Sequence, residues 1–368
     1  MRWSCCCLVM TEIESFVFPE DTVRELPSAF GGAPLTGCLR ASPEDFRVEE
    51  ILGYQLTAAG EHLVLKIEKR GLNTRDVAAA IARWAGVKPV AVGFAGLKDR
   101  IAVATQHFSV ALPGDHPDPD ALQQENALRV LAVSRHRRKL RRGELAGNRF
   151  ALTLTDVSGD RGQAEEILER MRAMGFPNYF GPQRFGRRSS NLVRAQALLT
   201  GRLKRPKPEQ RRMLLSAARS HVFNQVLAAR VRSHIWCTAL PGEVLLRAID
   251  GQQLLAPQVA PALTERVNAG ELDPSGPLPG RRGRCLVPEG GAQDFETRWL
   301  AELGLEAWIQ ALADLGLHAD RRSLRARPRN LEWAWGGERT LALRFELPSG
   351  SYATSLVREL MSTELARQ

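Results

Sequence analysis

The triplet Lys98-Asp99-Arg100 is the first place in this sequence where chemistry is suggested, because it sets an acid between two cations. Apolar runs stand on both sides, which predicts a strand, a tight turn and a second strand. A carboxylate flanked by cations at the end of a strand is placed where it could act as a reactive group. Most triplets of this kind are ordinary surface ion pairs, so the triplet by itself does not establish an active site.

The motifs of the common enzyme classes are missing from the sequence. Residues 93–98 (GFAGLK) do not have P-loop spacing, and no GxGxxG, HExxH or GxSxG motif occurs. Residues 114–120 are acidic but lack the glycine and closing glutamate of a calcium loop. His107 alternates within the second strand and is interpreted as a packing residue. What is left is a reaction without metal or cofactor, based on one carboxylate and on positioning.

Positive charge is the second indication of function. The sequence has 51 Lys and Arg against 41 Asp and Glu, a net charge of +10, which indicates a polyanionic partner such as RNA or DNA. The densest cluster, residues 135–142 (RHRRKLRR), lies between strands expected at 128–133 and 150–155, a placement that favours phosphate contact. Two further basic stretches cover residues 201–212 and 321–329.

Length and composition limit the class of protein. A chain of 368 residues with 44% hydrophobic content predicts two globular domains. No run approaches the ~20 apolar residues of a membrane-spanning helix, so no membrane association is expected. The six cysteines form neither a disulfide framework nor a zinc-binding pair, which predicts a cytoplasmic location.

The elements that must position Asp99 are strands at both ends of the chain, with helices between them. We expect strands at 35–40, 46–51, 62–68, 91–95, 105–112, 331–335 and 340–347. We expect helices at 76–84, 163–174, 190–199, 209–235, 294–303, 306–315 and 353–365, and an exposed loop at 270–292. This order predicts a mixed domain that is interrupted by a helical insertion.

Six segments together resemble the signature blocks of the TruD-type pseudouridine synthases, in that family's order. They are residues 38–50, 93–110, 139–150, 176–186, 214–231 and 347–360. The resemblance implies a mixed α/β fold, a pseudouridine-synthase catalytic domain around an antiparallel sheet with a mainly helical insertion. The implied domains are an N-terminal extension and irregular lead-in (1–33), the catalytic domain (34–172 plus 328–368) and the TRUD insertion domain (173–327).

The resemblance implies an isomerase that converts uridine 13 of transfer RNA to pseudouridine. The N1–C1′ bond breaks and the uracil is rejoined through C5, with Asp99 on the family's catalytic aspartate. Attack at C1′, attack at C6 and proton abstraction from the sugar in a glycal route all stay open. The reaction has no net redox change and no second substrate, so no cofactor or metal is expected. Transfer RNA is the expected partner of a monomer without an obligatory protein partner.

The resemblance also implies how the flipped base is held. Phe46, Phe150 and Tyr352 match positions that contact the uracil or its sugar, and Asn148 matches a polar contact to the base. Stacking of a base on an aromatic ring contributes on the order of 1–3 kcal/mol. Arg40 stands where the family commonly has Lys and keeps a positive charge near the acid with a different geometry. Tyr352 stands where Phe is common and adds a hydroxyl group.

Alternatives to these roles come from the residues themselves. Without the resemblance, Phe46 and Phe150 would be core residues and Asn148 a turn residue. In the segment 177–186, Tyr179 and Phe180 are expected to brace a domain junction. The alternative function is a non-catalytic RNA-binding protein or RNA chaperone on the same scaffold; the intact triplet 98–100 favours the enzyme.

Overall fold

The computed structural model describes residues 13, 17–123 and 127–363. The chain divides into two compact units. We call residues 34–166, 328–353 and 360–368 the sheet unit, and residues 1–33, 167–327 and 354–359 the helix unit. Each unit is described by itself.

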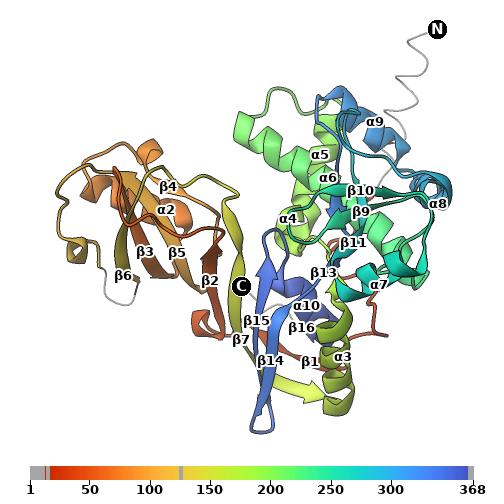
Figure 1. Ribbon diagram of the computed structural model, residues 1–368, viewed down its shortest axis with the longest axis horizontal. Coiled ribbons are helices and arrows are strands. Elements are labelled where there is room, and N and C mark those ends of the chain that lie inside the picture. Colours follow the sequence, from red (N-terminus) through yellow and green to blue (C-terminus); the bar gives the residue numbers. More distant parts are fainter. Residues whose placement is uncertain (1–12, 14–16, 124–126, 364–368) are drawn as a thin grey trace. The chain divides into compact units, whose positions relative to one another are not determined.

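The sheet unit is built on one large sheet of ten strands in the described chain (Figure 1). Its path runs β14-β15-β7-β2-β5-β3-β6, with β1, β4 and β16 attached beside it. The bounds are β1 Leu35–Leu39, β2 Phe46–Leu52, β3 His62–Arg70, β4 Gly93–Phe94, β5 Val103–Ala111, β6 Leu128–His136, β7 Leu145–Gly159, β14 Arg329–Gly336, β15 Thr340–Pro348 and β16 Met361–Thr363. The β2–β5 and β1–β16 pairs are parallel, and the other pairs are antiparallel. The expected mixed α/β fold is confirmed.

One face of β3 and β5 carries the core of this unit. Leu63, Leu65 and Ile67 alternate along β3 and pack against helix α2 (Thr74–Trp84). Asn73 starts α2 with a capping box, in which its backbone N–H donates to Asp76 at 3.2 Å. The period-two pattern of β3 and the cap of α2 therefore produce a layer of strand and helix around one apolar core.

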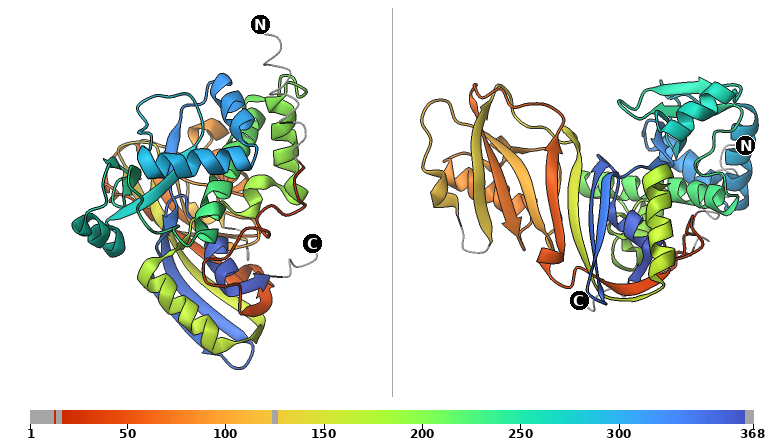
Figure 2. Two further views of the ribbon diagram at one scale, coloured as in Figure 1. Left: turned by 90° about the vertical axis from the view of Figure 1, so that its right-hand side faces the viewer. Right: turned by 60° about the horizontal axis from the view of Figure 1, so that its bottom comes forward.

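Strand β7 pairs with strands from the N-terminal and the C-terminal parts of the sequence. It pairs with β2 on one side and with β15 on the other, so Asn148 lies opposite both Glu50 and Leu347. Figure 2 shows the blue strands β14 and β15 beside the yellow-green β7. Gly147 permits this approach, because a Cβ atom there would lie 2.3 Å from the carbonyl oxygen of Leu347.

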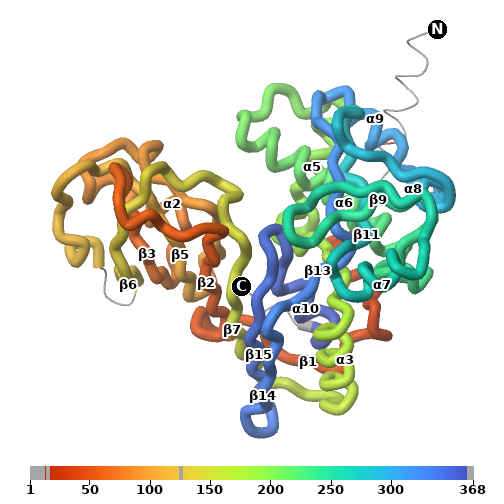
Figure 3. The backbone as a smooth tube through the Cα atoms, viewed as in Figure 1, coloured from red at the N-terminus to blue at the C-terminus, as the bar shows by residue number. Residues whose placement is uncertain are grey.

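The helix unit centres on the long helix α6 (Pro208–Arg232), whose buried face packs with α5 (Ser190–Leu199) and α9 (Glu306–Asp314). The unit also contains a sheet of order β10-β9-β11-β12, whose β9 and β11 can be followed in Figure 3. The remaining bounds are α3 Arg161–Met174, β8 Phe176–Pro177, α4 Pro182–Phe185, β9 Glu243–Arg247, β10 Gln253–Ala256, α7 Pro261–Ala269, β11 Leu272–Leu278, α8 Gly290–Glu302, β12 Asp320–Ser323, β13 Arg325–Ala326 and α10 Ala353–Leu360.

Two local expectations are wrong. The segment 270–292 is not all loop, because β11 occupies Leu272–Leu278 between β9 and β12. Gly276 on β11 packs so closely that an added Cβ would lie 2.8 Å from Leu324 and 3.0 Å from the Phe223 ring. The last helix ends at Leu360 and not at residue 365, since Met361 and Ser362 pair with Leu35 and Thr36 of β1. Long-range pairing overrides the local pattern in both places.

Candidate active site

Asp99 lies in the loop between β4 and β5, within the sheet unit. Its carboxylate Oδ2 accepts a hydrogen bond from Arg40 Nη2 at 2.7 Å, and its side chain is 30% exposed. Arg40 directly follows β1 and has a backbone φ of 69°, so the turn at the end of that strand aims the guanidinium at the acid. The structure therefore pairs the predicted acid with the predicted cation and leaves the acid accessible.

The Arg40 guanidinium also covers the ring of Phe46, with Cζ 3.9 Å from the ring centroid. Phe46 contacts Phe150 edge-to-face at 6.0 Å, and Phe150 stacks on Phe345 at 5.3 Å. Phe46 is 3% and Phe150 is 7% exposed. The two rings form a buried floor beneath the ion pair, with the cation on the face of one ring. Their contact with a base stays a prediction.

A buried polar chain connects the loop to β7. Lys98 Nζ donates to Asn148 Oδ1 and lies 3.8 Å from Glu50 Oε1. The Glu50 side chain is fully buried and accepts a hydrogen bond from the backbone N–H of His107 at 3.0 Å. Burial lowers the pKa of Lys98, and the nearby Glu50 and Asp99 oppose that shift. Asp99 directly follows Lys98 in the sequence. The contact of Lys98 with Asn148 therefore fixes the loop that carries the acid next to the Asn148 side chain.

Glu50 was not predicted from the sequence, although a signal for it exists. Phe46, Val48 and Glu50 share one face of β2 because side chains alternate along a strand. A carboxylate at the third apolar position of such a face requires a buried partner. The sequence pattern identifies His107 as a packing residue. Its Nδ1 atom lies 3.5 Å from Glu50 Oε2, and its side chain is 12% exposed.

Tyr352 lies in the segment between β15 and α10 and is half-buried. Leu347 and Pro348 of β15 lie opposite Asn148 and Gly147 of β7, and Ser349 N–H donates to Ala146 at 3.0 Å. This register places the start of the Tyr352 segment at the end of β7 that carries Asn148. Its contact with the substrate stays a prediction.

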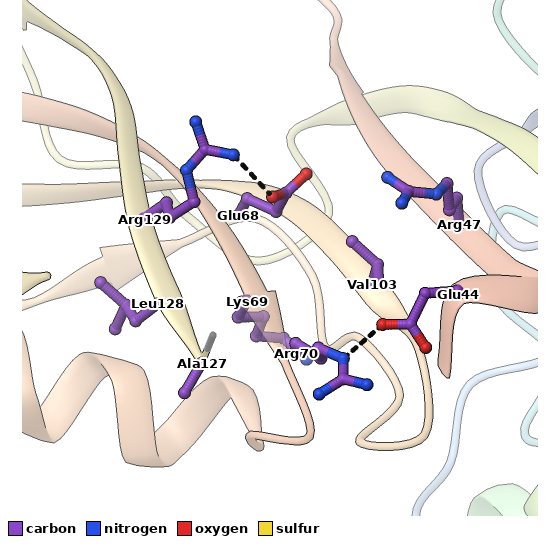
Figure 4. A pocket seen from close by; sticks show the side chains of 9 residues that line it. All are labelled: Glu44, Arg47, Glu68, Lys69, Arg70, Val103, Ala127, Leu128 and Arg129. Carbon is purple, nitrogen blue, oxygen red and sulfur yellow. Dashed lines mark hydrogen bonds and ion pairs between the residues drawn. The ribbon is translucent and has the colours of Figure 1, made fainter. Parts of the chain in front are cut away.

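A depression elsewhere on the sheet unit is lined by charged side chains but contains none of the predicted site residues (Figure 4). It is lined by Glu44, Arg47, Glu68, Lys69, Arg70, Val103, Ala127, Leu128 and Arg129. Arg70 pairs with Glu44, and Arg129 lies 3.8 Å from Glu68. These pairs compensate much of the charge, so we do not treat this depression as the active site.

The basic cluster 135–142 divides into cations bound within the unit and cations facing solvent. Arg135 donates to the Leu112 carbonyl at 2.9 Å, Arg138 pairs with Glu144, Lys139 donates to the Val90 carbonyl, and Arg142 lies over the Phe94 ring. Arg137, Arg138, Arg141 and Arg142 are all exposed, and two of them, Arg138 and Arg142, also make the contacts just named. The segment is a braced loop that presents four arginines.

In the helix unit, Tyr179 is fully buried and donates to the Pro27 carbonyl at 3.2 Å. Arg184 donates to Ser216 at 3.0 Å and lies near the Phe180 ring. Within the described ranges, no cluster of three or more His, Cys, Asp or Glu is arranged to hold a metal ion. None of the described helices is long and apolar enough to cross a membrane.

Comparison with known proteins gives one consistent family. The model of the family tRNA pseudouridine synthase D (TruD) matches residues 29–206 and 190–360. The chain is 41% identical over 339 residues to tRNA pseudouridine synthase D of Hydrogenovibrio crunogenus, covering 92% of this chain and 96% of the relative. It is 44% identical over 353 residues to the protein of that name from Nitrosococcus oceani, covering 94% and 97%.

A solved structure shows the same fold. A Methanosarcina mazei protein assigned to TruD superposes with a TM-score of 0.71 at 22% identity, covering 93% of this chain and 97% of that one. The family match and the relatives extend over nearly the whole chain, including the loop of Asp99, β7 and the segment of Tyr352. The chain belongs to the tRNA pseudouridine synthase D (TruD) family.

Proposed function

We propose that this protein is a tRNA pseudouridine synthase, an isomerase that converts uridine 13 of transfer RNA to pseudouridine, with Asp99 as the catalytic carboxylate. Family membership supports the reaction class and the RNA substrate. The observation that carries the role of Asp99 is its ion pair with Arg40, which orients a carboxylate that stays partly exposed. Family membership does not specify position 13 or the aspartate mechanism, and both are part of the proposal.

Arg40 and the ring floor give Asp99 the support that the chemistry requires. Isomerisation breaks the N1–C1′ bond and forms the C5–C1′ bond, so one group must stay in place while the detached uracil turns. The guanidinium is held between the Asp99 carboxylate and the Phe46 ring, which limits the movement of both side chains. A planar cation between a carboxylate and an aromatic face is a role that Arg performs better than Lys.

Asn148 is the group we assign to base recognition. Its Oδ1 accepts from Lys98 Nζ, and an ammonium group is only a donor, so the orientation of the amide is determined. The Nδ2 group then presents N–H donors, which complement a carbonyl oxygen of uracil. Phe46 and Phe150 are buried, so we assign the stacking surface to the half-buried Tyr352 and a supporting role to the other two rings.

Replacement of the acid tests the proposal directly. We expect Asp99→Asn to bind tRNA like the wild type but to form no detectable pseudouridine, because the amide is neither the nucleophile nor the base that the open routes require. Asp156→Asn is the matched control, since Asp156 is an exposed carboxylate of the same unit paired with Arg339. Single-turnover assays on unmodified tRNA, with filter binding in parallel, measure both quantities. Near-normal isomerisation by Asp99→Asn would overturn the assignment.

Mapping of pseudouridine in cellular tRNA tests the position. Cells that lack this protein should lose the signal at position 13, and cells that carry Asp99→Asn should lose it too. A loss confined to another position would contradict the proposed substrate. Salt-dependent tRNA binding by a wild-type protein that forms no isomer would instead support the non-catalytic RNA-binding alternative.

A further inference from the structure

Lys69 is a fully buried lysine near the end of β3. It occupies the next inward position after Leu63, Leu65 and Ile67, where an apolar residue would continue the core pattern. Burying an ammonium group is costly unless its donors are satisfied. This lysine therefore needs an explanation, and its hydrogen bonds provide one.

The acceptors of Lys69 are backbone carbonyls of two chain segments. Nζ donates to Leu72 O at 2.7 Å and to Asp99 O at 2.8 Å, and it lies 3.5 Å from Lys98 O. An ammonium group has three N–H donors, which matches the three carbonyls. The peptide groups on both sides of the Asp99 α-carbon are therefore held by one cation.

Other side chains hold the same loop at its flanks. Thr74 Oγ1 accepts from Lys98 N–H at 3.0 Å, and Arg100 Nε donates to Gly71 O at 3.1 Å. These contacts connect the loop to the first residue of α2 and to the turn that follows β3. Lys69 differs from them because it bonds the carbonyl of Asp99 itself from within the core.

We propose that Lys69 is a positioning residue for Asp99, which holds the backbone of the loop so that the carboxylate meets Arg40 and the substrate. It is not a catalytic residue, because its ammonium bonds backbone carbonyls. The inference rests on the proposed role of Asp99. A misplacement of about 1 Å can cost roughly 100-fold in rate, so anchoring of this loop has a large effect on catalysis.

The charge state of Lys69 connects the anchor to pH. Burial lowers the pKa of Lys69 to about 8; Asp99 and Asp76 oppose this shift, and Lys98 contributes to it. These are the charged groups that face the ammonium from the loop and from α2. Above this pH the neutral amine retains two N–H donors for three carbonyls, so the anchor is incomplete.

Two methionine variants on the same strand test the anchor. Lys69→Met removes the donors and keeps a similar length, whereas Lys66→Met removes a lysine that pairs with Glu49 on the other face of β3. We expect Lys69→Met to lower the single-turnover rate constant roughly 10- to 100-fold while tRNA affinity stays that of the wild type. We expect Lys66→Met to match the wild type. Equal rate constants for both variants would overturn the proposal.

The pH profile supplies a readout that a merely structural role would not change. The wild-type rate constant should fall above about pH 8, as Lys69 loses its proton, and this alkaline limb should be missing in Lys69→Met. If the rate constant of Lys69→Met falls above pH 8 in the same way, another group causes that fall, with Lys98 the nearest. This result would overturn the inference. If Lys69→Met fails to fold, the wild-type profile still decides: a flat profile from pH 7 to 9.5 overturns it.

Hydrogen exchange separates this proposal from the proposed function. Amides of residues 96–102 should exchange faster in Lys69→Met than in the wild type or in Lys66→Met, whether or not the protein is active. If the wild type forms no pseudouridine, the function fails and exchange alone decides the anchor; unchanged exchange overturns it. If Asp99→Asn is inactive as expected and Lys69→Met is as active as Lys66→Met, the anchor fails and the function stands.

Discussion

Arg40 shows how one side chain can combine several roles at this site. Its backbone lies in the left-handed region, with a φ of 69°, a conformation that costs a non-glycine residue about 1–3 kcal/mol. In return the guanidinium reaches Asp99 at 2.7 Å and covers the Phe46 ring at 3.9 Å. The strain is therefore located where the cation, the acid and the ring meet.

Substitution of Arg40 should separate charge from shape. Arg40→Met removes the hydrogen bond to the carboxylate, and the loss of a charged hydrogen bond costs about 1.5–3 kcal/mol. We expect a roughly 10- to 100-fold lower single-turnover rate constant, and a smaller loss for Arg40→Lys, which keeps the charge but not the planar group. Arg339→Met is the control, since that arginine is exposed and pairs with Asp156. A wild-type rate for Arg40→Met would show that the ion pair is dispensable.

The sequence predicts part of this site, and the unpredicted part has a physical reason. The cationic triplet and the block resemblance point to Asp99 and to a cation at Arg40, and the structure confirms that the two side chains pair. Glu50 was missed although strand alternation places it inward. Lys69 was missed because two of its three carbonyl partners lie in a loop about thirty residues away, and no local pattern reveals such acceptors.

At the scale of elements, helix α6 carries a buried histidine in the core of the helix unit. His221 packs against Phe18 and Trp308, with ring centroids 5.4 Å and 5.9 Å away. Burial lowers its pKa to about 4. Below the ordinary pKa of 6.5 the unfolded chain binds this proton and the folded chain does not, so stability falls as the pH drops from about 6.5 toward 4.

We expect this histidine to set an acid limit on stability. The shift corresponds to about 3 kcal/mol of unfolding free energy, which is lost by about pH 4. His221→Leu should be less sensitive to pH between 6.5 and 4, whereas His234→Asn should keep the wild-type profile because His234 is exposed. Urea titrations at several pH values, followed by tryptophan fluorescence, measure this. Parallel profiles for His221→Leu and the wild type would contradict it.

Elements with strong local patterns were predicted well, and elements that depend on distant partners were not. The helix expected at 190–199 is found at those residues as α5, and α6 differs from its expected bounds only at its ends. Strand β11 contains two prolines and a glycine, which locally indicate a loop, yet β9 and β12 pair with it. Such pairings cannot be read from one segment of sequence.

At the scale of the whole molecule, part of the net charge of +10 is carried by exposed arginines in particular loops. Four arginines are exposed on the braced loop between β6 and β7; Arg138 pairs with Glu144 and Arg142 lies over the Phe94 ring, whereas Arg137 and Arg141 are exposed without such a contact among the described side chains. A rigid loop loses little conformational freedom when it meets a phosphate backbone. We therefore expect Arg137 and Arg141 to contact tRNA.

Their removal should change the salt dependence of binding. Each lost phosphate contact lowers the slope of log K against log salt by roughly 0.7–0.9, so Arg137→Ala with Arg141→Ala should reduce the slope by roughly 1.4–1.8. The control pair is Arg298→Ala with Arg339→Ala, two exposed arginines at other places. Affinities measured from 50 to roughly 300 mM salt test this. The same slope in the loop variant and in the wild type would remove the loop from the interface.

The domain assignment also belongs to this scale. The chain passes from one compact unit to the other at residues 33/34, 166/167, 327/328, 353/354 and 359/360. The assignment of residues 34–172 plus 328–368 to catalysis and of 173–327 to an insertion stays a prediction.

The pairing of β7 with β15 has a consequence for the time course of synthesis. Leu154 of β7 lies opposite Leu341 of β15, so the ribosome must add nearly two hundred residues between the two partners. At typical elongation rates this delay is roughly 10 to 40 seconds. During that interval one edge of β7 lacks its strand partner in the nascent chain, and an unpaired strand edge is able to pair with another chain. The sheet that carries the acid is therefore finished only after β15 has been synthesised.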